Sequence, residues 1–504
     1  MAENVSIKRN VAASYISSIY AVLISIVMAP VYLSYMGTEA YGLIGFFTMM
    51  NAWFQLLDMG LTSTVIREAA LFRGGKISIG TLRVFLRGLE IVFGVVSITA
   101  ALVILFLTHT IATRWLKIGN LSVGDVQVAV ALMGVIVPVR WIAGLYRGVM
   151  IGFEKMTWLA TFNSALATMR FVGVLAVFLL IGVNVKYFFA YQFVVSLVDF
   201  FGAMFMSRYL IGVGKAEREP FSWKPLINNT GFSMTIGIVT TMSVLLSQAD
   251  KLVLSKVLPL ATFGIFSLAV AAASVINIAG TPMSQALLPR LTKLFAEGRR
   301  DALAQLYGNA TQAMGVIIYP AIIALAFFSE PIMRVWTGHD DFARHAAPIL
   351  TLYAAGNGLA AFNFFSYYIQ YAQGNLRLYF IGNAILLLFL LPAFIWGGIH
   401  YGGVGTGAAW AIANCLYFLF WVPLIHVRFL AGGHWNWLFR DILVVIAPTT
   451  LLCWVISLVA PWPQQRIPLI GSLAAAGLLL LLTAVASSSV ARATLLRIIR
   501  RSNS

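Results

Sequence analysis

The sequence is poor in charged residues. Only 10% of its 504 residues are charged, whereas 60% are hydrophobic, and a typical soluble domain carries about 25% charged residues. A soluble fold cannot hide this much apolar surface, because its exterior must be covered largely by polar groups. The composition therefore excludes a soluble protein and predicts a polytopic membrane protein.

Cysteine and histidine are also scarce. The chain has two cysteines, Cys415 and Cys453, and six histidines. Two thiols in apolar runs give neither a disulfide framework nor a metal-ligand spacing. The sequence also lacks a phosphate-binding glycine loop, a His-Glu-x-x-His motif and any loop long enough to form a soluble domain. These absences predict a protein without a cofactor and argue against an enzyme.

Long apolar runs dominate the rest of the chain. A helical membrane span needs about 20 mostly apolar residues, and the runs are continuously apolar rather than alternating as in a β-barrel. The fold class is therefore all-α, with about fourteen transmembrane helices. The predicted spans cover 11–34, 42–66, 85–108, 126–149, 158–182, 187–207, 226–250, 261–287, 309–329, 346–371, 378–396, 407–425, 442–460 and 468–486.

Basic residues predict the orientation of these spans. If the N-terminus lies in the cytoplasm, most of the 34 Lys and Arg residues fall in inner segments, as the positive-inside rule expects. The prediction is N-in and C-in. The net charge of +17 then reflects topology and attraction to anionic headgroups, so no nucleic-acid partner is needed.

An internal repeat divides the chain. The stretch "PVYLSYMGTEAYGLIGFF" at 30–47 resembles "KLVLSKVLPLATFGIFSL" at 251–268, about 222 residues later. Tyr41-Gly42 then matches Phe263-Gly264. Six predicted spans separate the copies, and an even number gives both copies the same orientation, which is typical of a parallel repeat. We therefore expect two six-helix lobes, 1–215 and 216–430, followed by 431–504 with two further spans and a basic cytoplasmic tail.

These motifs resemble a known family. "YLSYMGTEAYGLIGFF" followed by "LLDMGLTSTVIREAA", then "SQADKLVLSKVLPLATFGIFSLA" at 247–269 and "YAQGNLRLYFIGNAI" at 371–385, are similar to segments of Wzx-type polysaccharide flippases. That family belongs to the multidrug/oligosaccharidyl-lipid/polysaccharide (MOP) exporter superfamily, whose fold is MATE-like. The resemblance covers about 10–430, and its order along the chain is more specific than any single motif.

The resemblance implies a function and a location. Such proteins move undecaprenyl-pyrophosphate-linked oligosaccharide from the inner to the outer leaflet of the bacterial inner membrane by alternating access. The implied partners are this lipid-linked oligosaccharide and membrane lipids, with polysaccharide polymerase and export machinery as further candidates. The protein would be a transporter, coupled to a proton or sodium gradient, and not an enzyme.

Three arginines interrupt apolar spans and are the candidate substrate-binding residues. Arg140 and Arg147 lie in "GVIVPVRWIAGLYRGVMIGF" at 134–153, and Arg170 lies in the next span. Seven residues along a helix return to the same face, about 10 Å away. A mid-span arginine costs about 2.5–3.5 kcal/mol on insertion scales. We expect a cationic cavity that holds the pyrophosphate, with structural pairing to Asp199 or Asp58 as the alternative; Arg147 could also extend to headgroups.

The acidic residues within spans are candidates for ion coupling. A buried carboxylate can bind a proton or Na⁺, and Asp199 is the acid predicted to lie deepest within a span. Its alternative role is a salt bridge to Arg170. Asp58 is the second candidate, with helix packing as its alternative. Asp250 and Lys251 are predicted at the outer end of the seventh span, where they would shape the rim or gate.

Two other functions remain open. An ion-coupled multidrug exporter of the same fold would need an acidic or aromatic cavity for drug cations, whereas this one is predicted to be basic. A membrane polysaccharide polymerase or ligase would need a large outer loop bearing His and Arg, which this sequence lacks.

Overall fold

A computed structural model describes residues 7–212, 222–227, 230–276, 280–430, 432–460 and 462–502. These residues form helices, and their one extended pairing is an isolated bridge between Lys117 and Pro259. The all-α fold class is confirmed.

The chain forms two compact units, Met1–Gly264 and Ile265–Ser504. The predicted lobe boundary at 215 lies in 213–221, outside the described residues. The division into lobes at 215 and 430 therefore stays a prediction, and the two compact units are described here each by itself.

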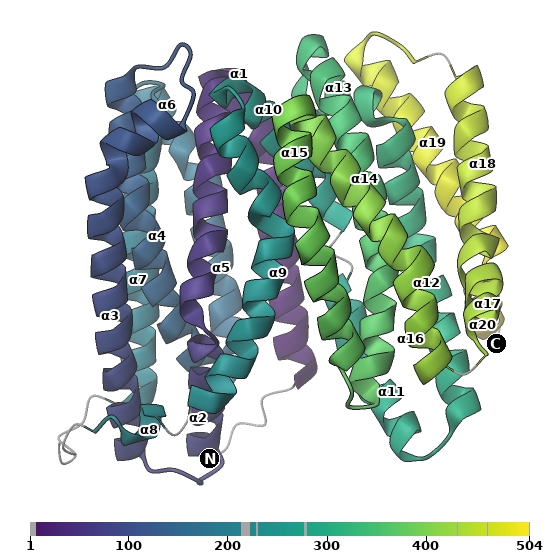
Figure 1. Cartoon of the computed structure of the whole chain (residues 1–504), viewed down its shortest axis with the longest axis horizontal. Coiled ribbons are helices and arrows are strands. Elements are labelled where there is room, and N and C mark those ends of the chain that lie inside the picture. The colour runs from purple at the N-terminus through teal and green to yellow at the C-terminus, as the bar shows by residue number, and fades with distance from the viewer. Residues whose placement is uncertain are drawn as a thin grey trace. The chain divides into compact units, whose positions relative to one another are not determined.

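The described residues of unit 1 form nine α-helices and two shorter helical turns before the helix that leads into unit 2. Figure 1 shows them in purple to teal. Their bounds are α1 Ile7–Phe54, α2 Leu61–Arg73, α3 Ile79–Thr110, α4 Val123–Gly152, α5 Met156–Phe171, α6 Gly173–Leu180, α7 Val185–Ile211, α8 Lys224–Ile227 and α9 Thr230–Val257, with a 3₁₀ turn η1 Gln55–Asp58 and a π-helical turn η2 Ile111–Trp115; α10 Leu260–Ser274 leads on.

Unit 2 continues from α10 and ends at the C-terminal helix. Its helices run from teal through green to yellow in Figure 1. Their bounds are α11 Gly280–Ala296, α12 Arg300–Phe327, α13 Ser329–Thr337, α14 Asp340–Ala372, α15 Arg377–Leu416, α16 Val422–Phe429, α17 His434–Asn436, α18 Val444–Val459, α19 Arg466–Ser487 and α20 Ser489–Ser502, with π-helical turns η4 Tyr417–Trp421 and η5 Trp437–Leu443.

Within the described residues, ten helices are long and apolar enough to span a membrane. Two of them, Ala12–Asp58 with 47 residues and Arg377–Phe429 with 53, are long enough to cross twice at 1.5 Å per residue. The predicted spans 261–287 and 346–371 are not among the ten. The count of fourteen crossings and the N-in, C-in orientation stay predictions.

Two glycines break the longest helices. Gly37 in α1 has φ 82° and Gly402 in α15 has φ 58°, a backbone region that side-chain-bearing residues rarely adopt. Each glycine falls between two predicted spans. One long helix thus becomes two apolar segments joined by a sharp bend.

The two copies of the repeat meet within unit 1. The closest approach is between Gly42 of α1 and the start of α10: a Cβ on Gly42 would lie 2.2 Å from the carbonyl oxygen of Leu260. A Cβ on Gly264 would likewise lie 2.1 Å from the carbonyl oxygen of Thr38. The glycines matched by the repeat are therefore at one crossing of two backbones, where no side chain fits.

The core of unit 1 fixes one face of α4. Leu145 and Val149 are fully buried with Val65 of α2 and Phe85 and Phe93 of α3. This packing leaves Arg140, Gly144 and Arg147, which are spaced four and three residues apart on α4, as a separate stripe.

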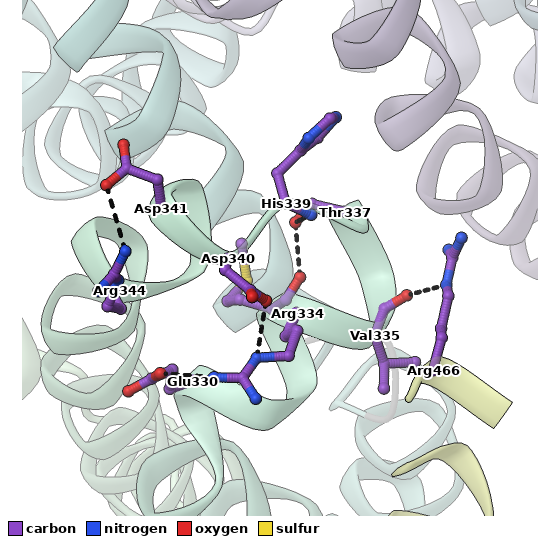
Figure 2. Close-up of polar contacts among 10 residues, drawn as sticks. Glu330, Arg334, Val335, Thr337, His339, Asp340, Asp341, Arg344 and Arg466 are labelled. Atoms are coloured by element: carbon purple, nitrogen blue, oxygen red, sulfur yellow. Dashed lines mark hydrogen bonds and ion pairs between the residues drawn. The ribbon is translucent and has the colours of Figure 1, made fainter. Parts of the chain in front are cut away.

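Ion pairs gather at one end of unit 2, where α13 meets α14. Figure 2 shows Arg334 of α13 between Glu330, one turn before it, and Asp340 at the start of α14. Both contacts are 3.0 Å long. Arg466 at the start of α19 donates from Nε to the carbonyl of Val335 at 3.0 Å. Arginine charge in unit 2 is here matched by neighbouring acids and by the carbonyl end of a helix.

Candidate functional site: a cationic cavity in unit 1

Unit 1 contains a cavity of about 670 Å³. Side chains from α1, η1, α2, α4, α5, α7 and α9 line it. All three predicted arginines and both predicted coupling acids are on its wall: Arg140, Arg147, Arg170, Asp58 and Asp199. The volume falls within the range of small-molecule sites, about 300–1,000 Å³.

Asp199 of α7 is the anionic centre of the arginine cluster. It is fully buried, and both of its carboxylate oxygens accept hydrogen bonds from the same nitrogen, Nη2 of Arg147. Nη2 of Arg170 is 3.6 Å from the second oxygen. The charge of one carboxylate therefore offsets part of the charge of two arginines. Each of these arginine side chains is about 27% exposed.

Arg140 is held by a different residue. Its Nη2 donates to Oε1 of Gln192 on α7 at 2.9 Å, and its guanidinium carbon lies 4.9 Å from the ring centre of Phe47. Nε2 of the same glutamine donates to the carbonyl of Arg170 at 2.9 Å. Gln192 thus connects the backbone beneath one arginine to the side chain of another, and Phe47 adds a cation–π contact.

The arginines keep unused donors. Within the described residues, Nε of Arg140, Arg147 and Arg170 and Nε1 of Trp141 are buried and have no hydrogen-bond partner. A buried N–H without an acceptor costs free energy. Four such donors on or beside one cavity wall are a site that an anion with several oxygens would complete.

A break between α5 and α6 presents Arg170. The carbonyls of Met169, Arg170 and Phe171 precede this break, and each accepts a side-chain hydrogen bond from another helix. The donors are Tyr191 at 2.8 Å, Gln192 at 2.9 Å and Tyr32 at 2.5 Å, in that order. Backbone carbonyls inside a membrane must be satisfied within the protein, so these donors allow the helix to break beside the cavity.

Asp58 has a local partner. Its carboxylate accepts from the backbone N–H of Thr62 at 3.3 Å and also from the Thr62 hydroxyl. Both donors belong to the first turn of α2, where an acid satisfies free N–H groups and the helix dipole. Asp58 therefore stabilises the start of α2; its coupling role and its packing role stay predictions.

Asp250 and Lys251 lie elsewhere. Neither is on the cavity wall, and α9 continues beyond them to Val257; their place at the outer end of the span stays a prediction. The side chain of Asp250 accepts from the backbone N–H of Lys251 at 2.7 Å, and Nζ of Lys251 donates to Gln248 at 2.9 Å. The rim and gate role of both residues stays a prediction.

The cavity has an excess of positive charge. Three arginines and two aspartates are its charged lining residues, and Asp58 is engaged by α2. Sequence reasoning found the five charges but missed Gln192, Phe47 and Trp141. The amide in the apolar run "FAYQFVV" at 189–195 was a signal for Gln192. Nothing in the sequence distinguished Phe47 and Trp141 from the many other aromatic residues.

The family is decided by the match to residues 7–295, more than half of the chain, of the polysaccharide biosynthesis protein family. The chain belongs to this family. A relative named "Putative O-antigen transporter" from Shigella flexneri is 21% identical over 386 residues, which is 75% of this chain and 87% of that protein. The predicted family resemblance is confirmed.

Solved structures share the fold of this family member. "Lipid II flippase MurJ, inward closed conformation" has a TM-score of 0.71 at 15% identity, covering 94% of this chain and 97% of that one. An inward-facing multidrug resistance MATE family transporter of the MOP superfamily has a TM-score of 0.64 at 12% identity, covering 82% and 96%. At these identities the likeness shows the fold, which confirms the predicted MATE-like architecture.

Proposed function

We propose that the protein is a flippase for undecaprenyl-pyrophosphate-linked oligosaccharide. It moves this lipid from the cytoplasmic to the outer leaflet of the bacterial inner membrane by alternating access. The observation that carries the proposal is the cavity, where Arg140, Arg147 and Arg170 gather with unused N–H donors. The family and the named O-antigen transporter support a lipid-linked sugar as cargo.

The transporter class has independent support. The matches are a transporter of O-antigen, a lipid II flippase and MATE transporters. The protein is therefore a multi-pass membrane transporter rather than an enzyme.

A diphosphate suits the arginine cluster chemically. Guanidinium groups bind phosphate oxygens by charge-assisted, often bidentate hydrogen bonds. Asp199 pairs with Arg147 and, at longer distance, with Arg170. The cavity therefore keeps a net positive charge that can bind the headgroup. In a desolvated cavity these contacts are stronger than in water, and the sugars would meet the polar wall at Thr48, Asn51 and Gln55.

Ion coupling is assigned to Asp199. A carboxylate in contact with Arg147 and Arg170 is the cavity group whose proton or sodium occupancy most directly changes the charge available to the headgroup. Asp58 is the second candidate, and no cofactor is required. Polymerase and export machinery would receive the flipped lipid at the outer leaflet.

Multidrug export is the second candidate because the MATE fold hosts it. A cationic drug would have to enter a cavity whose three arginines outnumber its two acids, so like charges oppose binding. The charge of the cavity therefore favours the flippase.

The test is a flipping assay in proteoliposomes with labelled undecaprenyl-pyrophosphate oligosaccharide. Arg140→Ala and Arg170→Ala are compared with Arg334→Ala. Arg334 is a matched control because it is ion-paired and 24% exposed, close to the 27% of Arg170, but belongs to unit 2 (Figure 2). We expect at least a tenfold loss of flipping for the cavity variants and normal flipping for the control. Equal rates for all folded variants would refute the cavity as the headgroup site, and a wild type that moves no such lipid would refute the function.

A further inference from the structure

Unit 2 contains a chain of titratable side chains that the cavity does not use. The Tyr307 hydroxyl of α12 is 2.9 Å from Nε2 of His426 on α16, and Nδ1 of His426 is 2.9 Å from Nδ1 of His434 on α17. His426 has no exposed surface, whereas His434 is partly exposed. The chain therefore runs from the buried interior of unit 2 towards its surface.

Aromatic rings enclose the buried imidazole. The ring of Trp437 stands perpendicular to His426 with 4.6 Å between centres, and Tyr307 stands at 85° with 5.6 Å between centres. Trp437 is itself fixed by a 2.9 Å hydrogen bond from Nε1 to the hydroxyl of Thr311. Rings of this kind hold an imidazolium as well as an imidazole, because their faces attract cations.

The charged groups near the chain come from η5 and α16. On η5, Asp441 accepts from Gln312 of α12 at 3.0 Å and acts electrostatically on Tyr307. Arg440 on η5 and Arg428 on α16 are exposed. Gln373, directly after α14, is uncharged and donates to the carbonyl of Phe429 on α16 at 2.9 Å.

We propose that His426 and His434 form a binding site for one proton. Two imidazole nitrogens 2.9 Å apart must have one hydrogen between them, since two lone pairs would repel. When that hydrogen belongs to His434, its Nε2 carries a lone pair and is the atom that accepts a proton from water. His434 then donates as an imidazolium to Nδ1 of His426, and Nε2–H of His426 donates to the Tyr307 oxygen.

Proton binding strengthens the contact without leaving a polar atom unpaired. The neutral hydrogen bond between the rings becomes charge-assisted, and such bonds are about twice as strong. The contact joins α16 to α17, and the Tyr307 hydroxyl joins this pair to α12. Occupancy by a proton therefore stiffens this junction of helices; its consequence for transport rests on the proposed function.

The direct test is ¹⁵N nuclear magnetic resonance of the histidine-labelled full chain in lipid nanodiscs between about pH 5 and pH 8. Only six histidines are present. The other four, His109, His339, His345 and His400, are exposed and serve as internal controls. We expect two further histidines to titrate together as one coupled pair, and His434→Gln to shift the titration of His426. Two rings that stay neutral throughout, or that titrate independently in the wild type, would overturn the proposal without any variant being needed.

A second experiment measures flipping by the same protein and distinguishes the proton site from the proposed flippase function. Flipping in the wild type should change several-fold between about pH 5.5 and pH 7.5, and His434→Gln should lose the part of that response that follows the coupled titration. An unchanged pH profile in this variant would refute the link to transport. A coupled titration in a protein that flips no lipid would instead refute the proposed function and leave the proton site intact.

Discussion

At the residue scale, one carboxylate organises the cavity. Asp199 is buried and contacts both Arg147 and Arg170. Removing one partner of a buried pair leaves an uncompensated charge, whereas removing both can be nearly neutral. The pair is thus a strong determinant of local structure, and also a reserve of negative charge with which a diphosphate competes for the same guanidiniums.

This arrangement predicts a non-additive pair of substitutions. Arg147→Ala should destabilise the protein by about 3 kcal/mol because Asp199 keeps only its longer contact to Arg170. Adding Asp199→Asn should recover a large part of that loss. Thermal unfolding of the four variants of the cycle in one detergent measures the coupling; additive losses would show that the pair contributes no mutual stabilisation.

Gln192 gives a second prediction, for binding. Gln192→Glu places a carboxylate on Arg140 and removes the donor to the Arg170 carbonyl, so lipid-diphosphate affinity should fall about tenfold, in line with one charge-assisted hydrogen bond. Gln192→Met, which keeps the volume without a charge, is the control for packing. Affinity measured in nanodiscs should be highest for the wild type, lower for the methionine variant and lowest for the glutamate variant. An unchanged affinity for the glutamate variant would exclude Arg140 from the site.

The sequence predicts which charged residues line the cavity better than it predicts the residues they contact. The seven-residue spacing placed Arg140 and Arg147 on one face of a helix, and both line the cavity. Asp199 was considered as a partner of Arg170, and it contacts Arg147 as well. The partner of Arg140 is an amide 52 residues away, and no helical periodicity relates positions on two different helices.

At the element scale, the break after α5 controls where Arg170 lies. The sequence predicts one span over 158–182, and Met156–Leu180 is one apolar segment long enough to cross a membrane. Within it, α5 ends at Phe171 and α6 begins at Gly173. Gly173 permits the break to pack closely: a Cβ there would lie 2.1 Å from the Tyr191 hydroxyl oxygen. That hydroxyl donates to the carbonyl of Met169, so the glycine and the hydrogen bond depend on each other.

A methyl group at this position should therefore be costly. Gly173→Ala should lower stability by about 1–3 kcal/mol and displace Arg170, because Tyr191 must move. Gly94→Ala on α3 is the matched control, since nothing lies within 4 Å of its added Cβ, and it should be neutral or stabilising by up to about 1 kcal/mol. The measurements are the unfolding midpoints and flipping rates of both variants. Equal midpoints and equal rates would contradict the packing described for the break.

Helix existence was predictable because apolar runs of membrane length have few alternatives. The bends at Gly37 and Gly402 fall where the sequence separates spans. The end of α9 was not predictable from Asp250, since the helix continues past it to Val257. Helix ends and breaks depend on contacts from other helices, which a single run of residues does not contain.

At the scale of the whole molecule, the distribution of basic residues predicts which loops face the cytoplasm. Asn120 lies in a predicted outer loop and Glu297 in a predicted inner one, and both side chains are exposed. With Cys415 and Cys453 replaced by alanine, Asn120→Cys should react with a membrane-impermeant maleimide in spheroplasts, and Glu297→Cys should react only after permeabilisation. The reverse pattern would invert the topology and the direction of flipping.

The central claim is that unit 1 binds the diphosphate of a lipid-linked sugar through its arginines. The most direct measurement is the affinity of undecaprenyl pyrophosphate for the full chain in nanodiscs, with undecaprenyl monophosphate as the comparison and Arg334→Ala as the control variant. The account predicts that the wild type and the control prefer the diphosphate, and that Arg140→Ala and Arg170→Ala each lose about tenfold or more of that affinity. Equal affinity for both lipids, or full diphosphate affinity in the two cavity variants, would contradict it.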